Sequence, residues 1–320
     1  MEKQLKVHLL EDTEKELVET LKKQLSSKIK LSFGAIDKSK ADFEILVAGV
    51  PAVEDLSASK NLKRLIIPWA GLPRRTAEYM EQFPNVKINN LHYNAPIVAE
   101  NAITLMLAVT KKIIVIDRAF RRHDWRNRYL PLNPQLLDGK RVTLLGYGAI
   151  GQQIEKRLNG WEMRIRRVSR TAREGISAIT ELDTILKTTD LLFITLPHTS
   201  TTNGLLNKKR LAALPDNATL INLSRGPVIE EQALYDELKS GRIKAGIDVW
   251  YNYPKDKEEQ KNCPPSQFNF DELDNVVMTP HMAGHSDRSD ELLIEDLARL
   301  LNELADGKTD RNRVSLEHGY

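Results

Sequence analysis

The stretch Gly146-Tyr147-Gly148-Ala149-Ile150-Gly151 lies between an apolar strand-like run and a helical pattern, and it decides the fold. The run before it, residues 141–145, is rich in Val, Leu and Thr. After it, Ile150, Ile154 and Leu158 recur at helical spacing. A strand, a glycine-rich turn and a helix in this order bind the pyrophosphate of a dinucleotide, because the turn lets the phosphates approach the N-terminus of the helix. The stretch therefore predicts a dinucleotide-binding α/β unit.

Three later motifs each follow another apolar run, namely Arg225-Gly226, Asp248-Val249 and Pro280-His281. In an open parallel sheet, ligands bind outside the carboxyl ends of the strands. We therefore expect the Arg, Asp and His side chains to converge on what the glycine turn holds. This order of motifs predicts chemistry on a bound dinucleotide.

Size and composition indicate a globular protein of two domains. The chain has 320 residues, which is long for one hydrophobic core. Hydrophobic residues make up 41% and charged residues 28%, which excludes the disordered and fibrous classes. The net charge of +3 is too small to indicate binding to nucleic acid or to a membrane surface, and we expect neither partner.

Cysteine content and the absence of long apolar runs favour a cytoplasmic location. The single cysteine, Cys263, excludes an intrachain disulfide, and residues 1–6 lack the apolar core of a signal peptide. No apolar run approaches membrane-spanning length. The residues His198, His285 and His318 show no metal-ligand spacing, so we expect no metal.

The first hundred residues alternate short apolar runs with a helical pattern, which is typical of a small parallel α/β domain. The predicted strands lie at residues 7–10, 43–47 and 65–67, and the predicted helix lies at residues 14–25.

One long helix, from residue 97 towards Arg118, is expected to separate this block from the glycine turn. A final helix at residues 289–305 has leucines on one face and is expected to return to the first domain. Between them lie four more buried-strand patterns, at residues 190–195, 218–222, 245–248 and 276–278.

Hydride transfer between a nicotinamide and a 2-keto or 2-hydroxy acid needs a cation for the carboxylate and an acid/base for the hydroxyl proton. Arg225 suits the first role, because a guanidinium matches a carboxylate with two parallel hydrogen bonds and stays charged. His281 suits the second, because the ordinary pKa of an imidazole lies near working pH.

With the glycine turn, six further segments make the chain resemble the D-isomer-specific 2-hydroxyacid dehydrogenase family, which includes glyoxylate and hydroxypyruvate reductases and phosphoglycerate dehydrogenases. The resemblance covers essentially the whole chain. The matching segments are residues 94–100, 137–140, 196–199 with Thr202, 222–230, 246–250 and 279–284.

The resemblance implies two doubly wound parallel-sheet domains of the α/β class, with a Rossmann cofactor domain inserted into a flavodoxin-like substrate domain. The substrate domain would contain residues 1–97 and 289–320, and the cofactor domain residues 98–288. A homodimer built through the cofactor domains is also implied.

The resemblance further implies that Arg225 binds substrate, that His281 is the acid/base, and that the backbone at Ala70, Gly71 and Leu72 meets the substrate carboxylate. Asp248 would contact the nicotinamide side and Thr202 the pyrophosphate. The full set of implied cofactor-binding residues is Gly146, Gly148, Ala149, Ile150, Gly151, Ser169, Arg170, Thr171, Leu196, Pro197, Thr202, Leu223, Ser224, Asp248, Ala283 and Gly284.

Tyr253 departs from the family pattern. In most relatives a Glu lies five residues after the Asp and holds the catalytic His, whereas here Asp248 is followed at that distance by Tyr253. A phenol can hydrogen-bond an imidazole but carries no charge at neutral pH to stabilise imidazolium. We take Tyr253 as the candidate third catalytic residue. Formate dehydrogenases of the superfamily have a Gln here, and Asn94 matches a substrate-contacting Asn of that branch.

Residues Ser169, Arg170 and Thr171 occupy the place where an NAD-preferring fold offers Asp or Glu to the adenine ribose. Hydroxyl groups and a guanidinium suit a 2′-phosphate instead, so we expect NADP to be preferred, with NAD possible. The alternative is that Arg170 belongs to an exposed basic edge with Arg166, Arg167 and Arg173.

The sequence thus predicts an NADP(H)-dependent oxidoreductase acting on a small 2-keto or D-2-hydroxy acid of the glyoxylate or hydroxypyruvate type. Two alternatives stay open, namely a dehydrogenase of another small anion such as formate, and a non-catalytic dinucleotide-sensing protein of the same fold.

Overall fold

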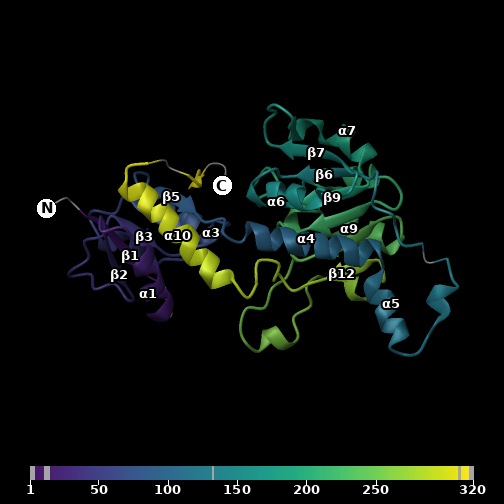
Figure 1. Ribbon diagram of the computed structural model, residues 1–320, viewed down its shortest axis with the longest axis horizontal. Coiled ribbons are helices and arrows are strands. Elements are labelled where there is room, and N and C mark those ends of the chain that lie inside the picture. The colour runs from purple at the N-terminus through teal and green to yellow at the C-terminus, as the bar shows by residue number, and fades with distance from the viewer. Residues whose placement is uncertain (1–3, 11–14, 132, 309–310, 317–320) are drawn as a thin grey trace. The chain divides into compact units, whose positions relative to one another are not determined.

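The computed structural model describes residues 4–10, 15–131, 133–308 and 311–316 (Figure 1). The chain divides into two compact units, with Met1–Asn94 and Ser286–Tyr320 in unit 1 and Ala95–His285 in unit 2. Both divisions fall a few residues before the expected junctions after residues 97 and 288. Each unit contains its own sheet. The expected α/β class with two doubly wound sheets is confirmed.

Unit 1 contains a six-stranded sheet in the order β13-β5-β4-β3-β1-β2. The five parallel strands therefore follow the flavodoxin-like order 2-1-3-4-5. One edge differs from the expected all-parallel sheet, because β13 pairs antiparallel with β5. The strands are β1 (Leu5–Leu9), β2 (Ile29–Phe33), β3 (Ile45–Val47), β4 (Arg64–Ile67), β5 (Lys87–Asn90) and β13 (Arg313–Val314).

Helices cover both faces of this sheet (Figure 1). Buried leucines of α1 (Lys15–Gln24) and α10 (Ser289–Ala305) share one hydrophobic cluster with β1 and β3. Leu56 of α2 (Val53–Ala58) and Met80 of α3 (Arg74–Met80) belong to the cluster on the other face. The apolar stripe of α10 thus completes the core begun by the N-terminal strands.

Unit 2 contains a seven-stranded parallel sheet in the order β12-β11-β10-β9-β6-β7-β8. Numbered from its first strand, the order is 7-6-5-4-1-2-3, a Rossmann arrangement with one additional strand. The central strands are fully buried, which explains their continuous apolar sequences. The strands are β6 (Arg141–Leu145), β7 (Arg164–Ser169), β8 (Ser177–Ala178), β9 (Leu191–Ile194), β10 (Thr219–Asn222), β11 (Lys244–Ile247) and β12 (Val276–Met278).

Helices α4 (Ala95–Thr110) and α6 (Ala149–Leu158) pack on one face of this sheet (Figure 1). The other face is covered by α7 (Leu182–Ile185), α8 (Lys208–Ala212) and α9 (Glu231–Lys239). Single 3₁₀ turns lie at Arg126–Arg128, Ile179–Glu181, Leu186–Thr188, Gly226–Val228, Glu259–Lys261 and Phe270–Glu272.

The expected single long helix is wrong, because the segment forms two helices, α4 and α5 (Ile113–Phe120). Between them Lys112 has a left-handed φ of 56°, which ends the α-helical path. The Nζ of Lys111 donates to the carbonyl of Gln135 at 2.5 Å, so this corner is held by the segment that returns to the sheet.

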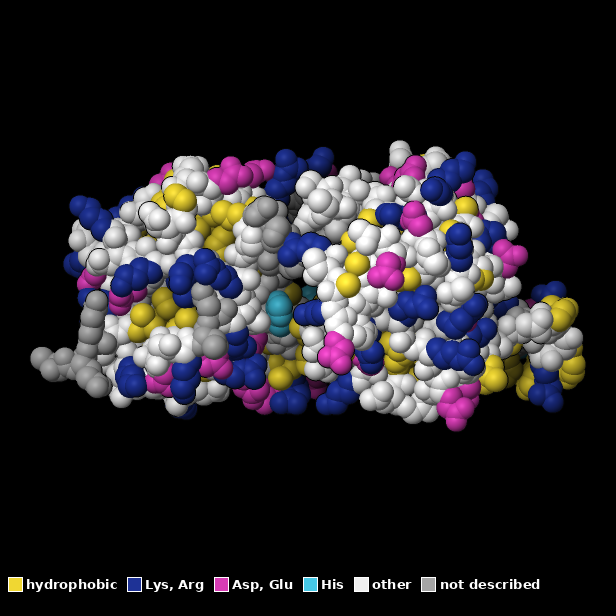
Figure 2. Space-filling model, turned by 90° about the horizontal axis from the view of Figure 1, so that it is seen from above, with side chains coloured by type: hydrophobic (Ala, Val, Ile, Leu, Met, Phe, Trp, Pro, Cys, Tyr) yellow, Lys and Arg dark blue, Asp and Glu magenta, His cyan; other side chains and the backbone are white. Residues whose placement is uncertain are grey.

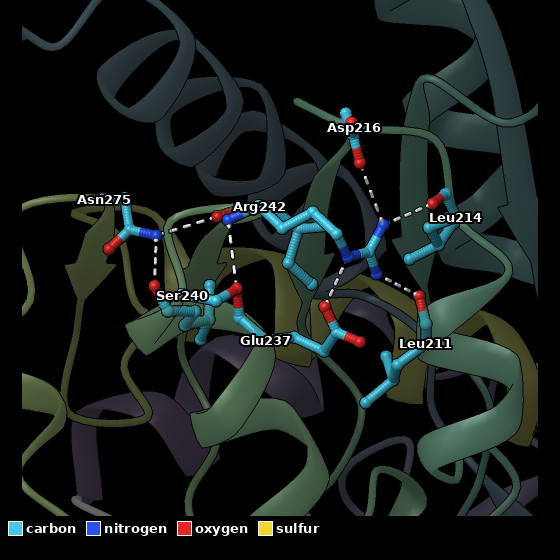
Figure 3. Close-up of polar contacts among 9 residues, drawn as sticks. Leu211, Leu214, Asp216, Glu237, Ser240, Arg242 and Asn275 are labelled. Atoms are coloured by element: carbon cyan, nitrogen blue, oxygen red, sulfur yellow. Dashed lines mark hydrogen bonds and ion pairs between the residues drawn. The ribbon is translucent and has the colours of Figure 1, made fainter.

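Arg242 lies at the amino edge of the unit 2 sheet, opposite the edge that carries the glycine turn. Its side chain makes several polar contacts there (Figure 3). Its guanidinium donates to the carbonyl oxygens of Leu211 and Leu214 at 2.7 and 2.5 Å, at the C-terminal end of α8. Its Nε donates to Glu237 of α9 at 2.5 Å, and Asp216 lies 3.7 Å from the guanidinium. The side chain therefore joins two helices to the start of β11.

Candidate functional site

The glycine turn after β6 leaves open space at the N-terminus of α6. Gly146 has a φ of +102°, and a Cβ there would lie 2.8 Å from the backbone of Thr195. A Cβ on Gly151 would lie 2.7 Å from the carbonyl oxygen of Gly146, so this glycine lets helix and strand pack closely. Gly148 differs, because no heavy atom lies within 4 Å of its Cβ position. This free space, in front of the amide groups that begin α6, fits a pyrophosphate.

The predicted adenosine end of the site lies after β7. The hydroxyl of Ser169 donates to the carbonyl of Thr171 at 2.7 Å, which shapes the turn that presents the exposed Arg170. Arg167 is engaged elsewhere, because its guanidinium pairs with Glu155 of α6. The same guanidinium lies over the ring of Tyr147, 5.6 Å from its centroid. These contacts occupy Arg167 and connect the turn to β7.

Thr202 closes the loop that follows β9. Its hydroxyl donates to the carbonyl of Pro197 at 2.7 Å and accepts from the amide of Thr199 at 2.8 Å. Thr202 is buried, and Leu196 packs into the core below it. The loop at the carboxyl end of β9 is therefore a closed turn, beside the glycine turn of β6.

Arg225 is presented by a buried turn at the end of β10. The side-chain oxygen of Asn222 accepts from the amide and the hydroxyl of Ser224, at 3.1 and 2.7 Å. A Cβ on Gly226 would lie 2.3 Å from the carbonyl oxygen of Trp250, so the chain can pass there only as glycine. Arg225 itself is exposed, and its guanidinium donates to the carbonyl of Ser224 at 2.6 Å. The fold thus fixes the backbone and leaves the cation free to meet an anion.

Asp248 holds the loop that carries His281. The carboxylate is 2% exposed and accepts from the hydroxyl of Thr279 at 2.7 Å. It also accepts from the amides of Met282 and Ala283, both at 3.0 Å. His281 lies between these donors with a left-handed φ of 55°. Asp248 therefore sets the backbone that presents the imidazole, and its predicted contact with a nicotinamide stays a prediction.

Trp250 is a residue that the sequence interpretation missed. Its indole Nε1 donates to the carbonyl of Thr279 at 2.9 Å, so it stabilises the start of the loop that carries His281. Its amide donates to the hydroxyl of Tyr253 at 3.1 Å. The only signal in the sequence was its place two residues after Asp248, which says nothing about these partners.

The structure brings Tyr253 against His281 through ring contact. The two ring centroids lie 5.5 Å apart, with the planes inclined at 60°. Burial raises the pKa of Tyr253, so its hydroxyl stays neutral. Partial burial lowers the pKa of His281, the Arg225 guanidinium lowers it further, and Asp248 opposes both effects. The imidazole of His281 therefore contacts the ring of the neutral Tyr253 and is influenced by the positive charge of Arg225.

In unit 1, the backbone predicted to meet a carboxylate lies after β4. Asn90 donates from its side-chain nitrogen to the carbonyl of Ala70 at 2.6 Å, which fixes this turn. Gly71 and Leu72 are half-buried. The side-chain oxygen of Asn94 is buried without a hydrogen-bond partner among the described residues, and it is an acceptor that a ligand could satisfy.

The residues that the structure describes contain neither a candidate metal cluster nor a membrane-spanning helix. No group of three or more His, Cys, Asp or Glu side chains is placed to hold a metal ion in this part of the chain. No helix in the same residues is long and apolar enough to cross a membrane.

Comparison with known proteins places these features in context. The family described as "D-isomer specific 2-hydroxyacid dehydrogenase, NAD binding domain" matches residues 103–283. The chain is 30% identical over 305 residues to a glyoxylate reductase of Pyrococcus horikoshii, covering 88% of each protein. It is 31% identical over 271 residues to a D-3-phosphoglycerate dehydrogenase of Archaeoglobus fulgidus, covering 82% of this chain but only 49% of that protein.

Among solved structures, a D-isomer specific 2-hydroxyacid dehydrogenase from Xanthobacter autotrophicus in complex with NADPH and MES is similar with a TM-score of 0.79. The two sequences are 23% identical, and the match covers 99% of this chain and 100% of the other. This likeness supports the fold described above.

Proposed function

The chain belongs to the D-isomer-specific 2-hydroxyacid dehydrogenase family, and we propose that within it the protein is an NADP(H)-dependent reductase of a small 2-keto acid. The observation that carries this proposal is the grouping of Arg225, Tyr253 and His281 at the carboxyl ends of the unit 2 strands. Glyoxylate and hydroxypyruvate are the proposed substrates, with the D-2-hydroxy acid as product.

The chain's own residues supply binding and proton transfer. When bound, the reduced nicotinamide supplies a hydride to the carbonyl carbon. Arg225 binds the substrate carboxylate through its guanidinium. The imidazolium of His281 donates a proton to the carbonyl oxygen, so that one hydride and one proton convert the keto acid to the hydroxy acid. Asp248 keeps the His281 loop in place throughout.

A panel of 2-keto acids assayed by loss of reduced-nicotinamide absorbance tests the proposal. We expect NADPH consumption with glyoxylate or hydroxypyruvate. The presence of Tyr253 in place of a charged partner for His281 favours a second candidate, a non-catalytic dinucleotide-sensing protein. NADPH binding without turnover of any keto acid or formate would favour the sensor, and turnover of formate alone would identify a formate-type enzyme.

The pH dependence of reduction should reflect Tyr253. Because the pKa of His281 is lowered and Tyr253 brings no charge to oppose this, reduction should decline from a lower pH than with a carboxylate neighbour. Tyr253→Glu should extend reduction to higher pH, since a carboxylate favours imidazolium. The measurement is kcat/KM against pH for both proteins, with Tyr253→Phe as the uncharged control. Identical profiles for Tyr253→Glu and wild type would exclude this role.

We propose that NADPH is preferred over NADH through Arg170. The guanidinium is exposed at the end of β7, and it suits the doubly charged 2′-phosphate. Arg170→Ala should weaken NADPH binding about ten- to a hundredfold, about 1.5–3 kcal/mol for a charge-assisted contact, and leave NADH binding unchanged. Arg173→Ala is the matched control from the same exposed edge. Equal wild-type affinities for the two cofactors, or an unchanged ratio in Arg170→Ala, would remove Arg170 from the site.

We also propose a cytoplasmic homodimer built through unit 2. Seven of the twelve exposed large hydrophobic side chains of the described residues lie between residues 113 and 136 (Figure 2, right-hand end). Such an apolar concentration is typical of an interface. Light scattering should give twice the chain mass of 36.4 kDa, and a single-chain mass would contradict the dimer. The seven are Ile113, Ile114, Phe120, Trp125, Tyr129, Leu130 and Leu136.

A further inference from the structure

Trp69 lies where β4 ends in unit 1, directly before the backbone of Ala70 and Gly71. The side chain is half-buried against the cluster that also contains Leu56 and Met80. It thus begins the same turn that is proposed to meet the substrate carboxylate. The sequence motifs assign no role to this tryptophan.

The six-membered ring of Trp69 rests on Gly49, which lies two residues after β3. A Cβ added to Gly49 would lie 1.8 Å from Cη2 of Trp69 and 2.3 Å from its Cζ2. The ring therefore fills the space that a side chain at residue 49 would occupy. A side chain at residue 49 would therefore require the indole to shift, and the backbone of Gly49 backs the ring on the side of β3.

The backbone on both sides of the indole is held by buried donors. The hydroxyl of Thr76, fully buried, donates to the carbonyl of Gly49 at 2.9 Å. Asn90, 3% exposed, donates to the carbonyl of Ala70 at 2.6 Å. These hydrogen bonds fix the backbone of Gly49, against which the ring packs, and the turn that carries Trp69. The indole therefore has a fixed position at the carboxyl edge of the unit 1 sheet.

We infer that Trp69, seated on Gly49, is a specificity-determining residue that limits the size of the group attached to the keto carbon of the substrate. The inference rests on the proposed function and on the expectation from the family resemblance that the backbone at Ala70–Leu72 meets the substrate carboxylate. A substrate held there has its side chain next to the indole. Because the indole packs against the backbone of Gly49, it resists displacement by a larger substrate. Each additional carbon beyond the available space should therefore lower kcat/KM.

Substrate size selectivity tests the inference. Wild type and Trp69→Ala are compared on glyoxylate, pyruvate, 2-oxobutanoate and 4-methyl-2-oxopentanoate with NADPH. Trp69→Ala should raise kcat/KM for the largest acid relative to glyoxylate at least tenfold, with most of the change in KM. Phe83→Ala is the matched control, since Phe83 packs on the same core cluster but precedes β5, at the amino edge of the sheet.

A double-mutant cycle tests the packing of Trp69 on Gly49 without any substrate. Gly49→Ala should lower the melting temperature of the wild type by several degrees, because the new Cβ collides with the indole. In the Trp69→Ala background the same change should have little effect, because the ring is gone. Equal losses in both backgrounds would show that the ring does not rest on Gly49.

The size inference is overturned if Trp69→Ala reduces glyoxylate and the larger acids in the wild-type ratio, or if Phe83→Ala changes that ratio equally. A wild-type protein that reduces none of the keto acids overturns the proposed function itself, and the inference with it. The two failures are therefore distinguished by the wild-type measurement alone.

Discussion

His281→Ala should lower the turnover of keto-acid reduction by about two to four orders of magnitude, with a smaller effect on KM, as expected for loss of a positioned acid. The reason is that the imidazole is the proton donor in the group formed with Arg225 and Tyr253. Substrate binding should persist because the guanidinium is untouched. Steady-state kinetics with NADPH and glyoxylate is the measurement.

His123→Ala is a close control for this variant. His123 is also exposed and also has a left-handed φ, of 60° against 55° for His281, so alanine meets the same backbone requirement at both positions. We expect His123→Ala to keep turnover within about twofold of the wild type, as for a surface change away from the chemistry. Near-normal turnover in His281→Ala would remove His281 from the acid/base role.

Arg225→Ala should raise KM and lower turnover together, by a combined two to three orders of magnitude or about 3–4 kcal/mol in kcat/KM, because the carboxylate loses its charged, bidentate partner. Arg225→Lys should recover only part of this loss, since an ammonium keeps the charge without the planar fork. The same removal should also alter the pH profile. Arg225 lowers the pKa of His281, so reduction by the alanine variant should persist to higher pH.

The two readouts separate a binding role for Arg225 from a structural one. A variant that merely disturbs the turn after β10 would lose activity without moving the pH profile. Arg225→Ala with unchanged KM and an unchanged profile would therefore contradict the assignment. Thermal denaturation should show little change, because the side chain is exposed and its turn is held by Asn222 and Ser224.

The parts of the fold that the sequence predicted are those encoded locally. The helix expected at residues 289–305 is α10, because its leucine spacing and polar flanks are all within one segment. The strands β9 to β12 were recognisable as continuous apolar runs bounded by turns. By contrast, β2 was not predicted, although its apolar and polar residues alternate, and as an edge strand it is largely exposed.

Arg225, Tyr253, Asp248 and His281 were named from the sequence, but their contacts and the contribution of Trp250 were not. The left-handed Lys112 depends on the turn that follows, and a helical pattern does not reveal it. The bonds from Asp248 to the His281 loop connect residues more than thirty positions apart. The contact of Trp69 with Gly49 requires two strands to be placed side by side first. Tertiary packing determines each of these features.

The interrupted path of the chain through unit 1 has a consequence for biosynthesis. Unit 2 is one continuous stretch, Ala95–His285, so all its strands are available once that stretch has left the ribosome. Unit 1 is different, because Leu297, Leu300 and Leu301 of α10 share a core with α1, and β13 pairs with β5. The N-terminal part of unit 1 therefore keeps some of its apolar surface exposed until α10 has been translated and can complete the core.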